Sequence, residues 1–260
     1  MIDFNKAKKE FDIYLKDYDN NNSKVDLKFR HTLGVINVIE YISEELGLSQ
    51  TDIDLAKLIA LLHDIGRFEQ AIKYDSFEDY QTMDHAQLAD KILFENGLIR
   101  KFIDTTKYDN TISKAILNHN RLNIEEGLEE KKLLHAQLIR DADKLDNFRV
   151  RANDNFEDIF DSSLEGLEQS EITDKIYEDF MNSRMIISTE RNHPADFWIS
   201  YLAYIFDINF VPSFRYIVEN EYIDTIIDRI DYKIPETKDR MENIRNHAKQ
   251  FINKKLEDHE

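Results

Sequence analysis

Apolar residues recur along this chain with the period of an α-helix. The segment 51–62 is the clearest case, because its apolar residues cover nearly the whole circumference of a helix, and we expect its C-terminal half to be buried. A second helix over 25–46 follows from Val35 and Val38 on one side, with Gly47 as its stop. The 260 residues include only six Gly and three Pro, so the chain has few of the turn-forming residues that β-hairpins need. The pattern therefore predicts an all-α fold.

Further segments with helical periodicity continue to the end of the chain. They cover 4–18, 84–97, a stretch from about residue 110, 124–150, 170–187, 195–210, 212–230 and 235–254. Gly66 is expected to follow the end of the 51–62 helix in a left-handed conformation. Residues 68–83 show no clear period and predict a long loop with about one helical turn, which edges or covers a site. Asp84 is expected to cap the helix that follows this loop.

Beyond Arg151 the chain stays helical without obvious chemistry. The apolar run 197–206 is too short and too closely flanked by charge to span a membrane, so it predicts a buried core helix. No internal repeat or low-complexity linker divides the sequence. We therefore expect a single domain over residues 1–260, whose part 151–260 forms an additional C-terminal helical layer.

The composition narrows the possible functions. The 52 acidic and 34 basic residues give a net charge of −18, which argues against binding a nucleic-acid duplex or an anionic membrane. The chain has no cysteine, so disulfides, zinc-thiolate sites and thiol nucleophiles are excluded, and nitrogen and oxygen must supply any metal ligands. Such ligands suit Fe, Mn, Mg, Zn, Co or Ni. An N-terminus without an apolar signal core predicts a cytoplasmic protein.

The doublet His63-Asp64 stands at the end of the most apolar helix. A buried carboxylate needs a cation, a hydrogen-bond network or a metal, because burying an uncompensated charge is costly. The adjacent imidazole favours a metal. The alternative is a histidine stabilised by the helix dipole next to a solvated aspartate.

Four further polar residues are expected to face the interior. They are His31 on the apolar face of its helix, His85 in a first helical turn, His119 on a buried stripe, and Asp143 one turn after Ile139. Any one of them alone is more often a core histidine or a surface acid, but together with the doublet they favour a shared site. Asp141 is the alternative to Asp143. The remaining histidines, in polar or terminal surroundings, are assigned no role: His135, His193, His247 and His259.

The order of these residues resembles the HD domain superfamily of metal-dependent phosphohydrolases: an early histidine, the doublet, and an aspartate within Asp-Ala-Asp-Lys-Leu-Asp. The resemblance covers about residues 25–150 and implies an HD-domain helical bundle, to which residues 151–260 are added. It implies that one divalent metal is bound by His31, His63, Asp64 and Asp143. His85 and His119 resemble the two extra histidines of the binuclear branch, which includes HD-GYP phosphodiesterases and di-iron HD oxygenases. The Gly-Tyr-Pro motif is missing, which argues against cleavage of a cyclic dinucleotide.

The resemblance implies one or two divalent ions, with Asp64 as the bridging and catalytic carboxylate and an acidified water as the nucleophile. We expect Arg67, Arg121 and Lys144 to bind substrate phosphate, and the alternative for each is a surface salt bridge. The preferred hypothesis is hydrolysis of a phosphate mono- or diester of a nucleotide or another small phosphorylated metabolite. One rival is a mixed-valent di-iron oxygenase acting on a small polyol or phosphonate, and another is a non-catalytic scaffold stapled by metal. The sequence specifies neither the substrate nor the oligomeric state.

Overall fold

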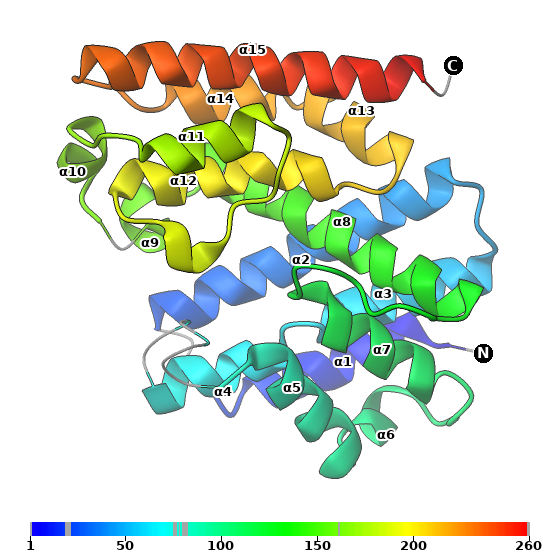
Figure 1. The fold of residues 1–260 in the computed structure, drawn as a ribbon. Helices are drawn as coiled ribbons and strands as arrows, with labels where there is room; N and C mark the ends of the chain where they lie inside the picture. Colours follow the sequence, from blue (N-terminus) through cyan, green and yellow to red (C-terminus); the bar gives the residue numbers. More distant parts are fainter. Residues whose placement is uncertain are drawn as a thin grey trace. The chain divides into compact units, whose positions relative to one another are not determined.

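The computed structural model describes residues 2–18, 22–74, 77, 79, 83–160 and 162–258, without the side chain of residue 158. Every regular element in these residues is a helix, and the described part of the chain contains no strand (Figure 1). The predicted all-α class is therefore confirmed. Within the same residues, no helix is both long and apolar enough to cross a membrane.

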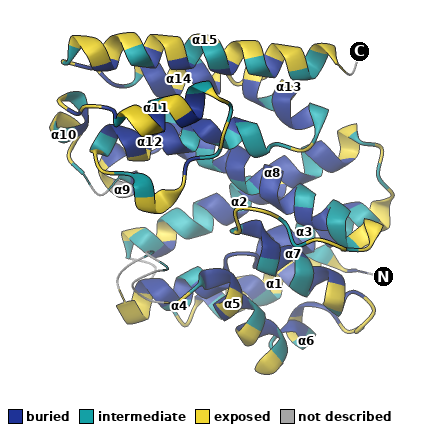
Figure 2. Cartoon of the chain, viewed as in Figure 1, coloured by how far each residue is buried: buried dark blue, intermediate teal, exposed yellow. Residues whose placement is uncertain are grey.

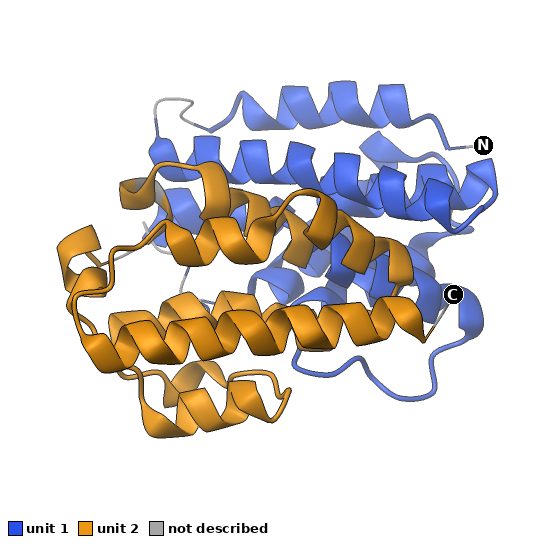
Figure 3. Ribbon diagram, turned by 90° about the horizontal axis from the view of Figure 1, so that it is seen from above, with its two compact units in different colours: residues 1–143 blue, residues 144–260 orange. Residues whose placement is uncertain are grey.

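The chain divides into two units, residues 1–143 and 144–260, which Figure 3 colours separately. The first contains α1 (Phe4–Leu15), α2 (Ser23–Glu45), α3 (Gln50–Leu62), α4 (Ile65–Tyr74), α5 (His85–Asp90), the π-helical turn η1 (Lys91–Glu95), α6 (Ile99–Phe102), α7 (Asp109–His119) and the start of α8 (Glu130–Asn153). The boundary falls inside α8, whereas the sequence placed a C-terminal layer after residue 150. The single domain expected over the whole chain stays a prediction.

The second unit contains the rest of α8 and the C-terminal elements. These are α9 (Phe156–Ile159), α10 (Leu164–Glu168), α11 (Asp174–Met181), the 3-10 turn η2 (Ser188–Glu190), α12 (Pro194–Leu202), the 3-10 turn η3 (Ala203–Asp207), α13 (Val211–Glu219), α14 (Tyr222–Asp228) and α15 (Pro235–Glu257). The expected helix 212–230 is in fact two helices, because Glu221 adopts a left-handed conformation with φ 52° between them. Helical periodicity does not detect such a one-residue break.

Helices α2 and α3 form the centre of the first unit. Their N-termini are capped by Asn22, whose side chain accepts from the Lys24 and Val25 amides, and by Ser49, which accepts from the Asp52 amide. Every residue of α3 from Leu58 to Leu62 is buried, as the apolar circumference of this helix predicts (Figure 2). This buried helix carries the chain directly into the histidine-aspartate doublet.

Gly66 does not end a helix, so that expectation was wrong. It lies in the first turn of α4, and it is not among the glycines with positive φ. A Cβ at this position would come within 2.6 Å of the His85 carbonyl oxygen and 3.0 Å of the Ala89 amide nitrogen. The glycine is therefore needed because α4 and α5 approach closely, and no left-handed turn is involved.

The long loop expected over 68–83 is also wrong up to Tyr74, because α4 continues to that residue. Phe68 is fully buried in α4, and its ring packs against Phe11 and Tyr18 at centroid distances of 5.8 and 5.9 Å. Tertiary packing of this one ring stabilises a helix whose sequence has a mixed, polar pattern. Of the remaining expected loop, residues 75, 76, 78 and 80–82 lie outside the described residues.

The second unit has its own aromatic core. Trp198 of α12 is buried, its ring packs against Phe156 and Phe160, and its indole N–H donates to the Ile226 carbonyl at 3.3 Å. The apolar run 197–206 therefore forms a core helix that ends in η3, as expected. Figure 2 shows exposed residues along one side of α15 and buried residues along the other.

His135 on α8 is fully buried, which corrects the polar surroundings expected from its neighbours in sequence. Neither of its ring nitrogens has a hydrogen-bond partner among the described residues, and the carboxylate of Asp52 lies 3.5 Å from Nε2. Burial lowers the pKa of His135 to about 4, although Asp52 opposes the shift. The folded protein therefore holds this ring neutral.

Because the pKa of His135 falls from 6.5 to about 4 on folding, the unfolded chain binds its proton first as the pH drops. Stability should then be lost between these two pH values. We expect His135→Phe to lose about 3 kcal/mol less unfolding free energy than the wild type between neutral pH and pH 4. Urea denaturation of both proteins in a chelator, at several pH values, measures this difference. Parallel pH profiles would contradict it.

Gly66→Ala should be strongly destabilising, because its methyl group would meet the backbone of α5. We expect a loss of about 1–3 kcal/mol in the free energy of unfolding, the range of overpacked sites. Urea denaturation of the metal-free protein measures it. An unchanged denaturation midpoint would show that α4 and α5 are not held as closely as described.

Candidate metal centre

Six polar side chains of the first unit converge from the ends and faces of different helices. They are His31 in α2, His63 at the C-cap of α3, Asp64 between α3 and α4, His85 as the first residue of α5, His119 as the last residue of α7, and Asp143 in α8. The Asp143 side chain is 21% exposed, and the other five residues are buried. These are the six residues singled out in the sequence.

The first group of ligand atoms comes from α2, the end of α3 and α8. His31 Nε2 lies 3.0 Å from Asp143 Oδ1 and 3.9 Å from Asp64 Oδ2. His63 Nε2 lies 3.6 Å from Asp64 Oδ2 and 3.9 Å from Asp143 Oδ1. One Asp64 oxygen thus faces two imidazoles, and both imidazoles also approach the Asp143 carboxylate.

The second group uses the other oxygen of Asp64. Its Oδ1 lies 3.5 Å from His85 Nε2 and 3.8 Å from His119 Nε2. The two histidine nitrogens are themselves 2.9 Å apart. In each of the sets His31, His63, Asp64 and Asp64, His85, His119, the potential ligand atoms lie within 4.8 Å of one another. Asp64 is therefore placed to bridge two cation sites.

Three of the histidines have their Nδ1 atoms engaged on the side away from Asp64. His63 Nδ1 lies 2.8 Å from the Ala60 carbonyl, and His119 Nδ1 lies 2.6 Å from the Ile116 carbonyl. Because a carbonyl only accepts, each Nδ1–H donates and the neutral ring keeps its lone pair on Nε2. Metal-binding histidines are commonly oriented in this way.

His85 is oriented by a carboxylate that the sequence analysis did not single out. Its Nδ1 donates to Asp79 Oδ2 at 2.7 Å, and Asp79 Oδ1 also accepts from Arg67 at 2.9 Å and from Gln70 at 3.1 Å. Burial raises the pKa of Asp79, but the contacts with His85 and Arg67 outweigh burial and lower the pKa to about 2. No local sequence signal identifies this partner, because Asp79 lies in an acidic stretch without periodicity.

The donor atoms fit divalent metal ions. His63 Nε2 is fully buried and has no hydrogen-bond partner among the described residues. With both Nδ1 atoms donating elsewhere, the neutral rings of His85 and His119 bring their Nε2 atoms within 2.9 Å of each other, a separation that suits two ligands of one cation. Two nitrogens about 2.1 Å from one ion and at a right angle would lie about 3 Å apart. Imidazole and carboxylate ligands suit the metals expected from the sequence.

Two cationic side chains border the cluster. Lys28 lies one turn before His31 on α2, and its Nζ is 2.8 Å from Asp64 Oδ2. Arg67 Nε lies 3.8 Å from Asp64 Oδ1, and this nitrogen has no hydrogen-bond partner in the described part of the chain. Both cations also lie within 6 Å of the Phe77 ring centroid, at 5.3 and 5.7 Å. Lys28 was missed in the sequence, although its spacing from His31 places it on the same helix face.

Neighbouring charges keep the two carboxylates ionised, and burial keeps the rings of His63 and His85 neutral. Burial raises the pKa of Asp64, but Lys28 and His63 more than offset it, so the pKa stays well below its ordinary value. The pKa of Asp143 is likewise lowered, because the His31 contact outweighs burial. Burial lowers the pKa values of His63 and His85 to about 4. At neutral pH the cluster therefore offers two ionised carboxylates and the neutral rings of His63 and His85, which are forms that bind a metal.

The other expected phosphate ligands have different surroundings. The Arg121 side chain is 46% exposed and pairs with Glu125 at 3.4 Å. Lys144, the first residue of the second unit, pairs with Asp207 at 2.8 Å. Asp141 is buried, but only Asp143 of this pair has a described contact with the histidines. Of the three basic residues, only Arg67 has a described contact with the cluster.

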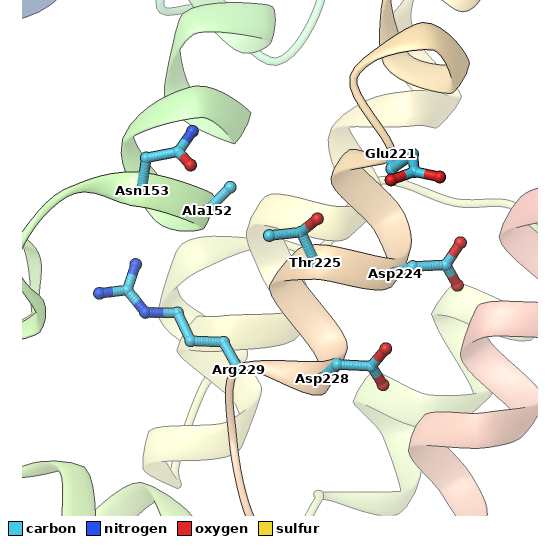
Figure 4. Close-up of a pocket in the computed structure, with 7 residues that line it drawn as sticks. All are labelled: Ala152, Asn153, Glu221, Asp224, Thr225, Asp228 and Arg229. Atoms are coloured by element: carbon cyan, nitrogen blue, oxygen red, sulfur yellow. The ribbon is translucent and has the colours of Figure 1, made fainter.

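A pocket of about 610 Å³ lies within the second unit, at the end of α8 and along α14 (Figure 4). It is lined by Ala152, Asn153, Glu221, Asp224, Thr225, Asp228 and Arg229. Asp224 and Asp228 both pair with Arg245, and Arg229 donates to the Arg151 carbonyl. No histidine is among the lining residues, and the pocket's main charges are used in these contacts. The metal chemistry therefore centres on the first unit.

Comparison with protein families gives one match, to the HD domain, over residues 29–147. This segment contains all six converging side chains. No curated protein and no solved structure matches the chain significantly.

Asp79→Asn should weaken the second group selectively. An asparagine amide can donate to His85 Nδ1, which would move the ring proton to Nε2 and block that nitrogen as a ligand. We expect a second divalent ion to bind about 10–100-fold more weakly, with the first little changed. Calorimetric titration of metal-free protein with Mn²⁺ measures both.

Asp90→Asn is the matched control. Asp90 lies on α5, the helix that His85 begins, and accepts a hydrogen bond from Ser113 of α7. It touches no histidine in the described contacts. It should bind metal like the wild type. Equal losses in both variants would contradict a specific role of Asp79.

Proposed function

We propose, on the premise that residues 29–147 match the HD domain, that the protein is a metal-dependent phosphohydrolase. Its substrate would be a phosphate mono- or diester of a nucleotide or another small phosphorylated metabolite. The observation that carries this proposal is the buried Asp64 carboxylate, shared by two ligand groups and bordered by two cations. HD domains form a superfamily of metal-dependent hydrolases, and the finer assignment rests on the geometry of this site.

The protein residues divide the work between metal binding and substrate binding. His31, His63, Asp64 and Asp143 would hold one ion, and Asp64, His85 and His119 a second. Divalent ions held there would supply Lewis acidity and an acidified water. The Nδ1 contacts of His63 and His119 leave the Nε2 lone pairs of the neutral rings facing the site, and burial of nearly all of these side chains excludes bulk water.

Lys28 and Arg67 provide the charge that an anionic substrate needs in a protein whose net charge is −18. The Arg67 guanidinium is held by Asp79 and Gln70, which orients it, while its Nε–H remains available beside Asp64. Guanidinium and ammonium groups bind phosphate oxygens through charge-assisted hydrogen bonds. We therefore assign both side chains to the substrate phosphate and leave Arg121 and Lys144 outside this assignment.

The same six ligands would serve the rival di-iron oxygenase. Lys28 and Arg67 already pair with Asp64 and Asp79, but the Arg67 Nε–H has no hydrogen-bond partner among the described residues and favours an anionic substrate over a neutral polyol. Oxygen uptake by iron-loaded protein with a polyol or phosphonate tests the oxygenase directly.

We expect the metal-loaded protein to hydrolyse simple phosphate esters such as p-nitrophenyl phosphate or its bis ester, and Lys28→Met to reduce kcat/KM. Loss of a charge-assisted hydrogen bond costs about 1.5–3 kcal/mol, which corresponds to about 10–100-fold. Release of p-nitrophenolate in the presence of Mn²⁺ or Co²⁺ measures it.

Lys57→Met is the matched control. Lys57 is buried to a similar degree as Lys28, pairs with Glu40, and lies over the Phe4 ring at 4.7 Å. It has no described contact with the metal cluster, so its variant should keep kcat/KM within about 3-fold of the wild type. Absence of ester hydrolysis with every metal, together with oxygen uptake by the iron form, would replace the hydrolase by the oxygenase.

A further inference from the structure

The position of His119 depends on the C-terminal end of α7, because it is the last residue of that helix. The last carbonyls of a helix have no partner within it and must be satisfied from elsewhere. Here the Ile116 carbonyl accepts from His119 Nδ1, and the Lys114 carbonyl accepts from the Asn118 side chain at 2.8 Å. The Asn118 side chain in turn accepts from the Glu125 amide at 2.8 Å and so holds the loop after the helix.

Asn120, the C-cap of α7, donates to Asp84 at 3.1 Å, and three further contacts at this helix end come from one buried arginine of α8. Arg140 is 2% exposed, and its NH1 donates to the carbonyl of Asn118 at 2.8 Å and to that of Arg121 at 2.5 Å. Its NH2 donates to the Leu122 carbonyl at 3.1 Å. One guanidinium thus joins the residue before His119 to two residues of the following loop. A cation at a helix C-terminus is also favourable to the helix dipole.

We infer that Arg140 is a positioning residue for the second metal group: it fixes the end of α7 so that His119 Nε2 faces Asp64 and His85. The inference rests on the proposed two-ion function. Arg140 does not touch the reacting atoms, and it acts only through the carbonyls that it binds.

The placement of Arg140 also links the two ligand groups. Arg140 and Asp143 lie one turn apart on α8, so a single helix carries a ligand of the first group and the support of the second. Removal of the guanidinium would leave the buried Asn118 carbonyl, next to His119, and two part-buried loop carbonyls without this donor. The first group has no described contact with Arg140, so its ligand atoms should stay in place.

The test is titration of the metal-free full chain with Co²⁺, in which calorimetry and visible absorption measure the binding of each ion. It compares the wild type with Arg140→Met and Arg140→Lys. We expect the second ion to bind at least about 10-fold more weakly to Arg140→Met, with the first ion within about 3-fold. Arg140→Lys keeps the charge but offers fewer and differently placed donors, so it should lie between the two. Circular dichroism confirms that each variant is folded, and Arg140→Lys carries the test where Arg140→Met does not fold.

Arg229→Met is the matched control. Arg229 binds two carbonyls at the end of α8, those of Arg151 at 2.6 Å and Asp154 at 2.5 Å, within the second unit (Figure 4). It makes the same kind of contact as Arg140 but touches no histidine in the described contacts. Its variant should bind both ions like the wild type.

Unchanged binding of the second ion in the Arg140 variants would overturn the inference. An equal loss of both ions, or the same loss in Arg229→Met, would also overturn it, because that pattern indicates general destabilisation. A wild type that binds one ion only would instead refute the two-ion function. In that case the test is NMR of the histidine ring nitrogens in the metal-free protein. We expect Arg140→Met to change the His119 ring-nitrogen signals, because the Nδ1–H form of this ring depends on the helix end that Arg140 holds. Unchanged His119 signals would overturn the role of Arg140.

Discussion

The buried carboxylate of Asp64 is the constraint on which this site depends. Each of its oxygens faces a different pair of imidazoles, and an uncompensated charge at this depth would be strongly destabilising. Lys28 provides one compensating charge, at 2.8 Å from Oδ2. The donor atoms around both oxygens are arranged as ligands of cations, which would provide the rest. The surrounding helices therefore have to place their ends and faces around a single carboxyl group.

Two of the histidines lie at helix C-termini, and the same local hydrogen bond orients both of them toward Asp64. His63 follows α3 and His119 ends α7, and each donates its Nδ1–H to the carbonyl three residues earlier. The contact satisfies a carbonyl that the helix leaves free, fixes the tautomer, and turns Nε2 toward Asp64. His85 stands at a helix N-terminus, where no such carbonyl exists, and it uses the Asp79 carboxylate instead.

Side chains outside the ligand set hold these ends in place, and they do so from distant parts of the chain. Gly66 allows α5 to come close enough for His85 to reach Asp64. Arg67 and Gln70 hold Asp79 against His85, and Arg140 holds the loop after His119. The second group of ligands thus depends on more loop contacts than the first, whose residues come from α2, the end of α3 and α8.

The sequence by itself determined the helical class, the boundaries of α2 and α3 to within two residues, and the six polar residues that converge. These follow from hydrophobic periodicity and from ligand types in a recognisable order, which are local or pairwise features. Only the tertiary structure decided that Gly66 is helical, that His135 is buried, and that Asp79, Lys28 and Arg140 support the cluster. The reason is physical: contacts of 2.5 to 3.1 Å between residues far apart in the chain leave no periodic trace in the sequence. Helical spacing shows which face a residue occupies, but the neighbour that meets this face is set by the packing of the other helices.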